Sequence, residues 1–396
     1  MHVKGIMHAL NLRTRISLLY EVSDPKGRIV PMEGMRGLAV GLVYFVHYFD
    51  FFHAYITPDA VVFTPFYFLA TIGNLGVDLF FVISDYLIYG ILLRRDQTYA
   101  KFWRRRIVRI YPVFLLALTV YVVLSLAQPG FDKIGHPAIP VGWWLMLNVM
   151  LLPGIFPVRP LIMVAWSLSY EFLYYLCSPL VVGGLRMWTW TGRRRVLFVA
   201  LVYLAGYGLL LRYPDERGRL LMFLAGVFLL EAKRAGLLDR KPSALGQIGA
   251  VAFVGLAFFI YFGINSSPLL WDGPTWIRMD SPHFVLTVPM FSVAFFLLCF
   301  YAFRPSGALA WFFSLKPIRY LGNMSYTVYL FHVLALEGVR WFAYRVTPPR
   351  GDQTGLFLLY CVVGWIAVWV LSTIVFALVE KPISLKKRVT ATVRSK

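Results

Sequence analysis

Apolar residues run along this chain in long blocks that short polar and basic segments separate. Blocks of nearly twenty apolar residues recur over the whole length, and an α-helix needs about twenty such residues to cross a hydrocarbon core roughly 30 Å thick. We place ten of them, at 34–53, 75–93, 110–127, 162–183, 196–212, 219–232, 246–264, 283–303, 320–343 and 356–379. The pattern predicts an all-α polytopic membrane protein with about ten transmembrane helices.

One further apolar block has a different character. The run "VGWWLMLNVMLLP", residues 141–153, is too short to span a bilayer, and Pro157 and Pro160 follow it closely. Irregular backbone at membrane depth is tolerated where protein buries it or where it lies at an interface. We therefore predict one extra re-entrant or interfacial segment near 141–153.

Basic residues alternate in density from one connecting segment to the next. They concentrate in 94–109, 186–195, 231–241 and the tail after 381, whereas 54–74 holds none. Because cytoplasmic loops carry the excess of lysine and arginine, this asymmetry predicts that both termini are cytoplasmic.

The chain shows no internal repeat, low-complexity tract or soluble appendage. Its first thirty residues also lack the apolar core of a cleavable signal peptide. We expect one transmembrane domain at 33–382, between a cytoplasmic tail at 1–32 and a basic cytoplasmic tail at 383–396.

Composition excludes several classes of protein. With 59% hydrophobic and 17% aromatic residues, the chain is not a soluble globule. A net charge of +20 would favour nucleic acid as the partner of a soluble protein, but here the basic residues serve as topology signals beside membrane lipids. The three cysteines, Cys177, Cys299 and Cys361, stand alone in separate apolar runs. Their spacing predicts neither a disulfide nor a metal site.

Titratable side chains occur inside the predicted spans at similar depths. Arg36 and His47 are eleven residues apart, so they share one helix face at a separation of about 16 Å. Glu171 lies about 12 Å from the outer end of its helix and His332 about 18 Å from the inner end of its own. Such residues are costly in a membrane, and three at one level favour a shared cavity. The alternatives are a packing histidine bonded to a carbonyl and a carboxyl group that is simply protonated.

A second cluster begins the third span. In "FWRRRIVRIYP", Arg106 and Arg109 stand at i and i+3 and therefore share one helix face. A guanidinium binds phosphate oxygens bidentately, and the start of a helix adds partial positive charge. The alternative is a topology signal or a ligand for lipid headgroups.

Six blocks of this sequence, in this order and spacing, resemble acyltransferase family 3. These membrane proteins O-acylate bacterial surface glycans and some small molecules. The blocks are "EGMRGLAVGLVYFVH", "GNLGVDLFFVISDYLI", "FWRRRIVRIYP", "WSLSYEFLYYLCSPL", "LGNMSYTVYLFH" and "VEKP". The resemblance extends from about Glu33 to Pro382.

The resemblance assigns roles to particular residues. The family's motif of an arginine followed eleven positions later by a histidine falls on Arg36 and His47, and its pair of arginines falls on Arg106 and Arg109. By this resemblance His47 is catalytic, and the arginines bind an acyl-coenzyme A donor. The block that begins at Trp166 places Glu171 beside them as a second catalytic candidate. Residues expected to line the cavity or to contact the acceptor are Asp78, Ser84, Asp85, Trp166, Ser167, Tyr329 and His332.

These residues predict a membrane O-acyltransferase of the bacterial inner membrane. It would move an acetyl group from cytoplasmic acetyl-coenzyme A, as a co-substrate, to a hydroxyl of a lipid-linked oligosaccharide or surface polysaccharide. No bound cofactor or metal is expected. His47 would act as a general base with Glu171 holding its tautomer, or as a nucleophile that forms an acyl-histidine; the sequence leaves both open.

Other readings of the sequence also stay open. The acceptor would otherwise be a small molecule such as a macrolide. A transporter, or a flippase or scaffold without enzymatic activity, is the alternative outside enzymology. The side from which the acceptor enters, and whether the protein is a homo-oligomer, are likewise undecided.

The chain departs from the family pattern at Asp85. In "FFVISDYLI" an aspartate follows the serine where the family usually has glycine, a residue that permits close contact between membrane helices. Asp85 lies seven residues after Asp78, near the same helix face. We expect it either to support a polar cluster in the cavity or to be a tolerated buried acid that weakens packing.

Overall fold

The computed structural model describes residues 12–21, 29–94, 98–128, 131, 133–135, 137, 139–265 and 282–383. Within these ranges every regular element is helical and no β-strand occurs, which confirms the all-α class. Residues 1–11, 22–28 and 384–396 of the two predicted tails lie outside the described residues.

The helices follow the apolar blocks closely. They are α2 Leu12–Tyr20, α3 Val30–Phe52, α4 Phe63–Gly73, α5 Leu75–Leu92, α6 Tyr99–Ala127, α7 Val141–Val149, α8 Trp166–Gly184, α9 Gly192–Arg212, α10 Leu221–Arg234, α11 Ala244–Asn265, α12 Pro282–Ala302, α13 Ala308–Phe313, α14 Lys316–Asn323, α15 Ser325–Val346 and α16 Thr354–Val375. Each of the ten predicted blocks coincides for most of its length with one of these helices, and the block 320–343 also includes the end of α14.

Seven helical segments in the described ranges are long and apolar enough to cross a membrane. They are Val30–Tyr55, Phe63–Leu92, Tyr99–Ala127, Gly192–Arg212, Ala244–Asn265, Val285–Ala302 and Thr354–Ile383. The other three predicted blocks hold α8, α10 and α15. Helix α10 has 14 residues, about 21 Å, which is shorter than a hydrocarbon core, and α8 and α15 carry many polar side chains. The count of ten therefore stays a prediction.

Helix α4 occupies part of the segment 54–74, which the sequence suggested to be a connecting loop. The run "FTPFYFLATIG" forms eleven helical residues that lead through Asn74 directly into α5. Its apolar residues pack on α3, and this packing explains why a short block with a proline near its start is nevertheless helical.

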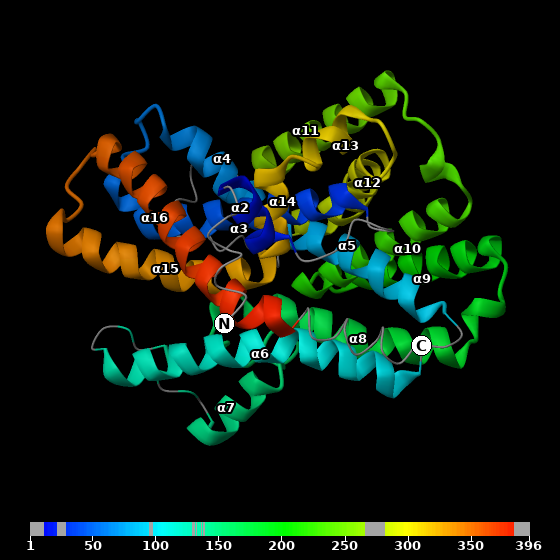
Figure 1. Cartoon of the computed structure of the whole chain (residues 1–396), viewed down its shortest axis with the longest axis horizontal. Coiled ribbons are helices and arrows are strands. Elements are labelled where there is room, and N and C mark those ends of the chain that lie inside the picture. Colours follow the sequence, from blue (N-terminus) through cyan, green and yellow to red (C-terminus); the bar gives the residue numbers. More distant parts are fainter. Residues whose placement is uncertain are drawn as a thin grey trace.

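Helix α3 lies at the centre of the molecule, with α4, α5, α14 and α15 packed around it (Figure 1). Its contact with α14 is unusually close because both helices present glycine. A Cβ atom at Gly322 would lie 1.6 Å from the Glu33 carbonyl oxygen, and one at Gly37 would lie 2.2 Å from the Ile318 carbonyl oxygen. Close packing on this face explains the glycines beside Arg36 in the first motif.

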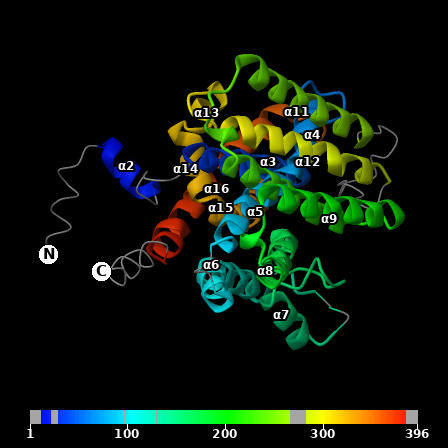
Figure 2. The same ribbon diagram turned by 90° about the vertical axis from the view of Figure 1, so that its right-hand side faces the viewer.

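Helices α6, α7 and α8 form a layer along one side of this central group, at the bottom of Figure 1. Figure 2 shows the same layer from the side, with α11 and α12 in the opposite part of the molecule and α9 between them and the layer. Residues of α3, α5 and α15 on one side and of α6 and α8 on the other enclose the cavity described below.

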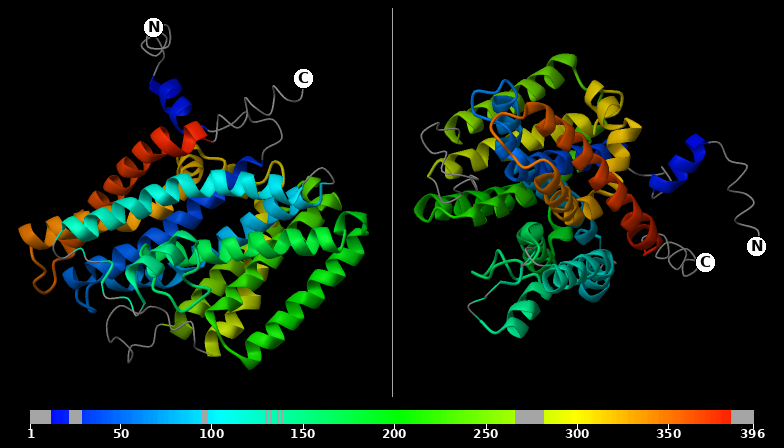
Figure 3. Two further views of the ribbon diagram at one scale, coloured as in Figure 1. Left: turned by 90° about the horizontal axis from the view of Figure 1, so that it is seen from below. Right: turned by 90° about the vertical axis from the view of Figure 1, so that its left-hand side faces the viewer.

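The two ends of the described chain meet. The Lys381 ammonium group donates a hydrogen bond of 2.9 Å to the Leu19 carbonyl oxygen and a second bond to that of Leu18. Figure 3 shows α2 and the end of α16 together at one end of the molecule. Both ends therefore lie on one side, as two cytoplasmic termini require, although which side faces the cytoplasm stays a prediction.

The segment 141–153 folds as the nine-residue helix α7 followed by a turn. At about 14 Å this helix is too short to cross a bilayer. The Trp144 indole donates to the Arg159 carbonyl oxygen at 2.9 Å, and the Leu161 amide donates to Asn148 Oδ1 at 2.8 Å. These bonds fix α7 against the chain that leads into α8. Its placement in or on a membrane stays a prediction.

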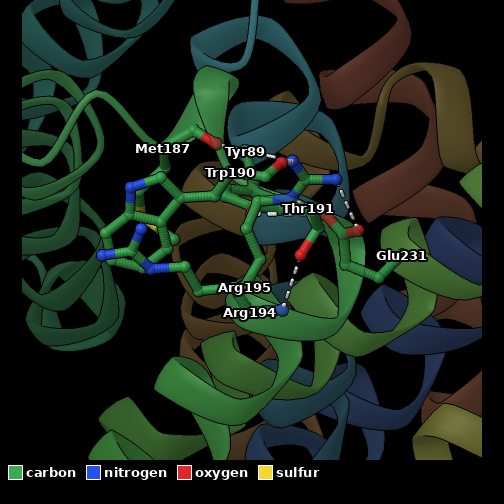
Figure 4. Close-up of polar contacts among 7 residues, drawn as sticks. All are labelled: Tyr89, Met187, Trp190, Thr191, Arg194, Arg195 and Glu231. Atoms are coloured by element: carbon green, nitrogen blue, oxygen red, sulfur yellow. Dashed lines mark hydrogen bonds and ion pairs between the residues drawn. The ribbon is translucent and has the colours of Figure 1, made fainter.

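A buried ion pair joins the start of α9 to the end of α10 (Figure 4). Arg195 donates through Nε and Nη2 to the two carboxylate oxygens of Glu231, at 2.8 and 2.9 Å, and through Nη1 to the Trp190 carbonyl oxygen. Tyr89 of α5 adds a hydrogen bond of 3.3 Å to the same carboxylate. Arg195 thus ties three helices together, although its segment was expected only to signal topology.

Candidate active site

A cavity of about 810 Å³, its open mouth included, lies between α3, α5, α6, α8 and α15. Its polar lining comes from five helices and is Arg36, Ser84, Arg106, Arg109, Ser167, Glu171, Tyr175, Ser325, Tyr326 and Tyr329. Apolar side chains of α5, among them Val77, Phe80 and Leu87, form much of the remaining wall. Residues from five of the six motif blocks therefore line one cavity. The fifth block, "LGNMSYTVYLFH", contributes Ser325, Tyr326 and Tyr329.

Three arginines converge on this cavity. Arg36 enters from α3 on the face opposite its glycines, while Arg106 and Arg109 enter from α6. Arg106 is buried and lies over the rings of Phe102 and Tyr175, whereas Arg109 is exposed. In the described part of the chain, none of the three is within 4.0 Å of a carboxylate oxygen. The cavity therefore carries positive charge that carboxylates do not directly neutralise.

Glu171 is the cavity's own acid, and it is hydrogen-bonded within the wall. Its Oε1 accepts a bond of 2.6 Å from the Ser84 hydroxyl and a second bond from the Tyr175 hydroxyl. The bond from Ser84 connects α5 to α8, whereas the bond from Tyr175 lies within α8. The carboxylate thus has partners other than His47, from which sequence reasoning expected a contact.

Tyr329 lies at the end of the cavity away from the arginines. Its hydroxyl is 2.7 Å from the Ser167 hydroxyl and donates at 3.0 Å to the Val164 carbonyl oxygen. Beyond it stand the two histidines: the Tyr329 and His332 ring centroids are 6.0 Å apart, and those of His332 and His47 are 5.0 Å apart. His47 and His332 are neighbours, as their predicted depths suggested, but they adjoin the cavity rather than line it.

The two acids of α5 and Trp166 lie outside the cavity lining. Asp78 pairs with Arg219 at 2.7 Å, both side chains being fully buried, and the Arg219 guanidinium lies over the Trp166 ring. Asp85 accepts a hydrogen bond from Tyr174 and packs against α10, where a Cβ atom on Gly226 would come within 2.8 Å of its own Cβ. Both acids thus join α5 to neighbouring elements.

Sequence reasoning missed three residues near the arginines. Tyr175 bonds to Glu171, and Tyr326 donates to the Ile110 carbonyl oxygen at 2.8 Å. Glu380 lies in a π-helical turn that follows α16, accepts a bond of 2.5 Å from Thr327 and interacts electrostatically with Arg36 and Arg109. The block "VEKP" contained a signal, since a glutamate ends a strongly apolar run, and π-helical turns occur frequently at functional sites.

The arrangement suits a long anionic ligand. Three guanidinium groups without a carboxylate oxygen within 4.0 Å in the described chain line the cavity together with apolar residues of α5, and two imidazoles lie next to Tyr329 in its wall. No group of three or more candidate metal ligands occurs among the described residues. The site thus offers anion binding and proton transfer by side chains.

Comparison with known proteins agrees with these observations. The profile of the family described as "Acyltransferase domain" matches residues 30–378. The O-acetyltransferase OatA of Staphylococcus aureus (strain NCTC 8325 / PS 47) is 27% identical over an alignment 288 residues long that covers 66% of this chain and 45% of that protein. The putative O-acetyltransferase SACOL0978 of S. aureus (strain COL) is 27% identical over 299 residues, 67% of this chain and 46% of the relative.

The chain thus matches a little under half the length of these curated relatives. No solved structure matches it. The family profile, however, covers every motif block quoted above except the last, "VEKP", of which it reaches no part. The family predicted from the motifs is thereby confirmed, and this helical membrane protein belongs to the acyltransferase family 3.

Proposed function

We propose that the protein is an O-acetyltransferase of the bacterial inner membrane. It transfers an acetyl group from cytoplasmic acetyl-coenzyme A to a hydroxyl of a lipid-linked oligosaccharide or surface polysaccharide. The observation that carries the proposal is the cavity itself, where three arginines without a carboxylate partner within 4.0 Å in the described chain face the same space, next to a pair of imidazoles. The names of the relatives, which are O-acetyltransferases, support this reaction.

The donor's shape matches the distribution of charge in the cavity. Coenzyme A is anionic at its nucleotide end and carries its thioester at the far end of a long, uncharged pantetheine arm. Arg36, Arg106 and Arg109 would hold the phosphates, because planar guanidinium groups bind phosphate bidentately. The arm would then extend along the apolar wall of α5 toward Tyr329 and the histidines.

His47 would act as the general base. Its imidazole takes the proton from the acceptor hydroxyl as that oxygen forms a bond to the acyl carbon. The carbon–sulfur bond then breaks, and the coenzyme A thiolate leaves and takes up the proton from the imidazolium. Imidazole suits this role because its ordinary pKa lies near neutrality and it both accepts and returns the proton.

Glu171 would complete the catalytic site from the donor side. Its carboxylate holds the Ser84 and Tyr175 hydroxyls and offsets part of the positive charge of Arg36. Ser84, Ser167 and Tyr329 present hydroxyl groups to the same cavity, where they would contact the pantetheine arm or the acceptor.

The sidedness follows from the positive-inside rule. With both termini in the cytoplasm, the arginine end of the cavity faces the cytoplasm and meets the donor there. The acceptor would approach the histidine pair from the opposite half of the membrane. This arrangement allows an acyl group to reach a glycan without coenzyme A leaving the cytoplasm.

The test uses the purified full chain in lipid nanodiscs with radiolabelled acetyl-coenzyme A. Thioester cleavage or transfer to a lipid-linked oligosaccharide is expected from the wild type, and His47→Ala should lose it by about 10²- to 10⁴-fold, the range typical of general bases. His53→Ala is the matched control, because His53 directly follows the same helix and its Nδ1 lies within hydrogen-bond distance of the Phe49 and Asp50 carbonyl oxygens, away from the histidine pair.

Two results would contradict the proposal. Transport of a solute without any thioester cleavage by the wild type would favour a transporter. Activity of the His47→Ala protein within a few-fold of the wild type would remove this histidine from the mechanism.

A further inference from the structure

The two buried histidines form a pair that the reaction proposed above uses only in part. His47 of α3 and His332 of α15 have ring centroids 5.0 Å apart, which brings the ring edges within reach of one hydrogen bond. His332 is completely buried, whereas 6% of His47 is exposed. Of the two residues, His47 is therefore the more accessible.

Backbone carbonyl groups determine the tautomer of His332. Its Nδ1 lies 2.8 Å from the Tyr329 carbonyl oxygen and 3.1 Å from that of Val328. A carbonyl oxygen only accepts hydrogen bonds, so Nδ1 must carry the proton and donate it. In a neutral imidazole the other nitrogen, Nε2, is then an acceptor with a free lone pair.

This acceptor has a matching atom on the neighbouring ring. His332 Nε2 and His47 Nδ1 are both buried, and neither has a hydrogen-bond partner in the described ranges. Buried polar atoms are nearly always hydrogen-bonded. Glu171 does not accept from His47 Nδ1 in this structure; its Oε1 accepts from Ser84 and Tyr175 instead.

We propose that His332 is the positioning residue for His47: its Nε2 accepts a hydrogen bond from the His47 Nδ1–H. At a centroid separation of 5.0 Å, ring nitrogens that face each other lie within hydrogen-bond distance. His47 is then held in the tautomer whose Nε2 is unprotonated and ready to take the acceptor proton. This inference rests on the proposed function, because it requires that His47 is the general base.

The same bond supports the charged intermediate. When His47 has taken the acceptor proton, its imidazolium donates to His332 through a charge-assisted hydrogen bond, which is stronger than a neutral one. The hydrogen bonds from His47 to His332 and from His332 to the Tyr329 carbonyl oxygen thereby orient this base and stabilise its imidazolium. A carboxylate does the same for the histidine of a Ser-His-Asp triad. His332 touches neither donor nor acceptor in this scheme.

Two variants separate positioning from packing. His332→Phe keeps an aromatic ring but removes the acceptor, whereas His332→Gln retains an amide oxygen that accepts a bond from His47. We expect His332→Phe to lower kcat for acetyl transfer about 10- to 100-fold with KM for acetyl-coenzyme A unchanged within about twofold. His332→Gln should recover most of that loss, while His53→Phe should leave kcat unaltered.

Nitrogen-15 NMR of histidine-labelled protein in nanodiscs reads the tautomer without relying on activity. The His47 signals, assigned by their loss in His47→Ala, should show protonated Nδ1 and unprotonated Nε2 in the wild type and in His332→Gln. In His332→Phe this preference should disappear. Size-exclusion profile and melting temperature establish that each variant is folded.

The outcomes distinguish this inference from the function on which it rests. An active His47→Ala protein would overturn the function, whatever the spectra show. A folded His332→Phe protein with wild-type tautomer and kcat, or a folded His332→Gln protein no more active than His332→Phe, would overturn the positioning role while leaving the function intact.

Discussion

Arginine residues have different surroundings in two regions of this molecule. One region is the junction of α9 and α10, and the other is the cavity that α3 and α6 help to line. Arg195 is buried against Glu231 with both carboxylate oxygens bonded, and further bonds fix it to the chain before α9 (Figure 4). Arg36, Arg106 and Arg109 face one another across a cavity, with no carboxylate oxygen within 4.0 Å in the described chain. The first arrangement is complete without a ligand, whereas in the second the anionic donor proposed above would supply the missing partner.

This difference explains why the density of basic residues in a segment does not by itself reveal the role of its arginines. The segment 186–195 and the run 102–112 both read as topology signals, yet one contains a structural ion pair and the other a candidate phosphate site. What separates them is the carboxylate partner, and Glu231 lies 36 residues from Arg195 in sequence. Spacing along a single helix does not reveal such a partner.

The largest effect is expected where the arginine is already paired. Arg195→Ala leaves Glu231 buried without its partner, and breaking one side of a buried ion pair costs about 3 to 5 kcal/mol. We expect a marked fall in melting temperature and in yield of the purified protein. Arg194→Ala is the matched control, because this neighbour is exposed and stacks on Trp190. Equal melting temperatures for the two variants would contradict the structural role of Arg195.

The second effect is smaller and of a different kind. Arg106→Ala or Arg109→Ala removes one charge-assisted phosphate contact, worth about 1.5 to 3 kcal/mol, so the Kd for acetyl-coenzyme A should rise about 10- to 150-fold. Arg104→Ala, on the same helix but exposed and outside the cavity lining, should bind as the wild type does. Titration of the donor by isothermal calorimetry measures all three.

Stability gives the cross-check on this second prediction. The melting temperature of the Arg109 variant without donor should match or exceed that of the wild type, because removing one of three facing cations relieves repulsion. Arg106→Ala also loses its contacts with the Phe102 and Tyr175 rings and should melt slightly lower. Unchanged donor affinity in both variants would return these arginines to the role of topology signals and would remove the difference between the two regions.

Sequence predicted the helical elements and much of the site because both depend on local patterns. Hydrophobic blocks of helical length located α3 and α5, and the similar depths of His47 and His332 along separate helices predicted that the two histidines are neighbours. The eleven-residue spacing of Arg36 and His47 likewise fits one face that leads from the cavity to the histidine pair.

The remaining features depend on contacts between helices. The bond from Ser84 to Glu171 is not readable from sequence, because it depends on the packing of α5 on α8, whereas Tyr175 stands four residues after Glu171 on the same helix. The pairing of Asp78 with Arg219, 141 residues away, is equally a tertiary contact. Depth along a helix is therefore readable from sequence, whereas the direction of a side chain around it is only partly so.

The smallest effect concerns Asp85, where this chain has an acid in place of the family's usual glycine. The structure shows Asp85 outside the cavity lining, bonded to Tyr174 through one oxygen, with its other oxygen buried and unpartnered in the described ranges. It also presses on α10 at Gly226, the point at which a small residue lets the two helices approach.

Asp85→Gly tests whether this acid belongs to the fold or to the reaction. The change removes a buried polar group that is only half satisfied, which is favourable, and it adds helix flexibility and leaves Tyr174 without its acceptor, which are unfavourable. We expect the first effect to exceed the others slightly, so the melting temperature should rise by a few degrees and the transfer rate should stay within about twofold of the wild type or increase.

Asp85→Asn, which keeps the size of the side chain and an oxygen for Tyr174, is the matched control and should retain the melting temperature and the transfer rate of the wild type. A fall in transfer rate with no gain in stability would place Asp85 in the active site, because a residue that acts only through packing cannot lower catalysis while the fold is unchanged.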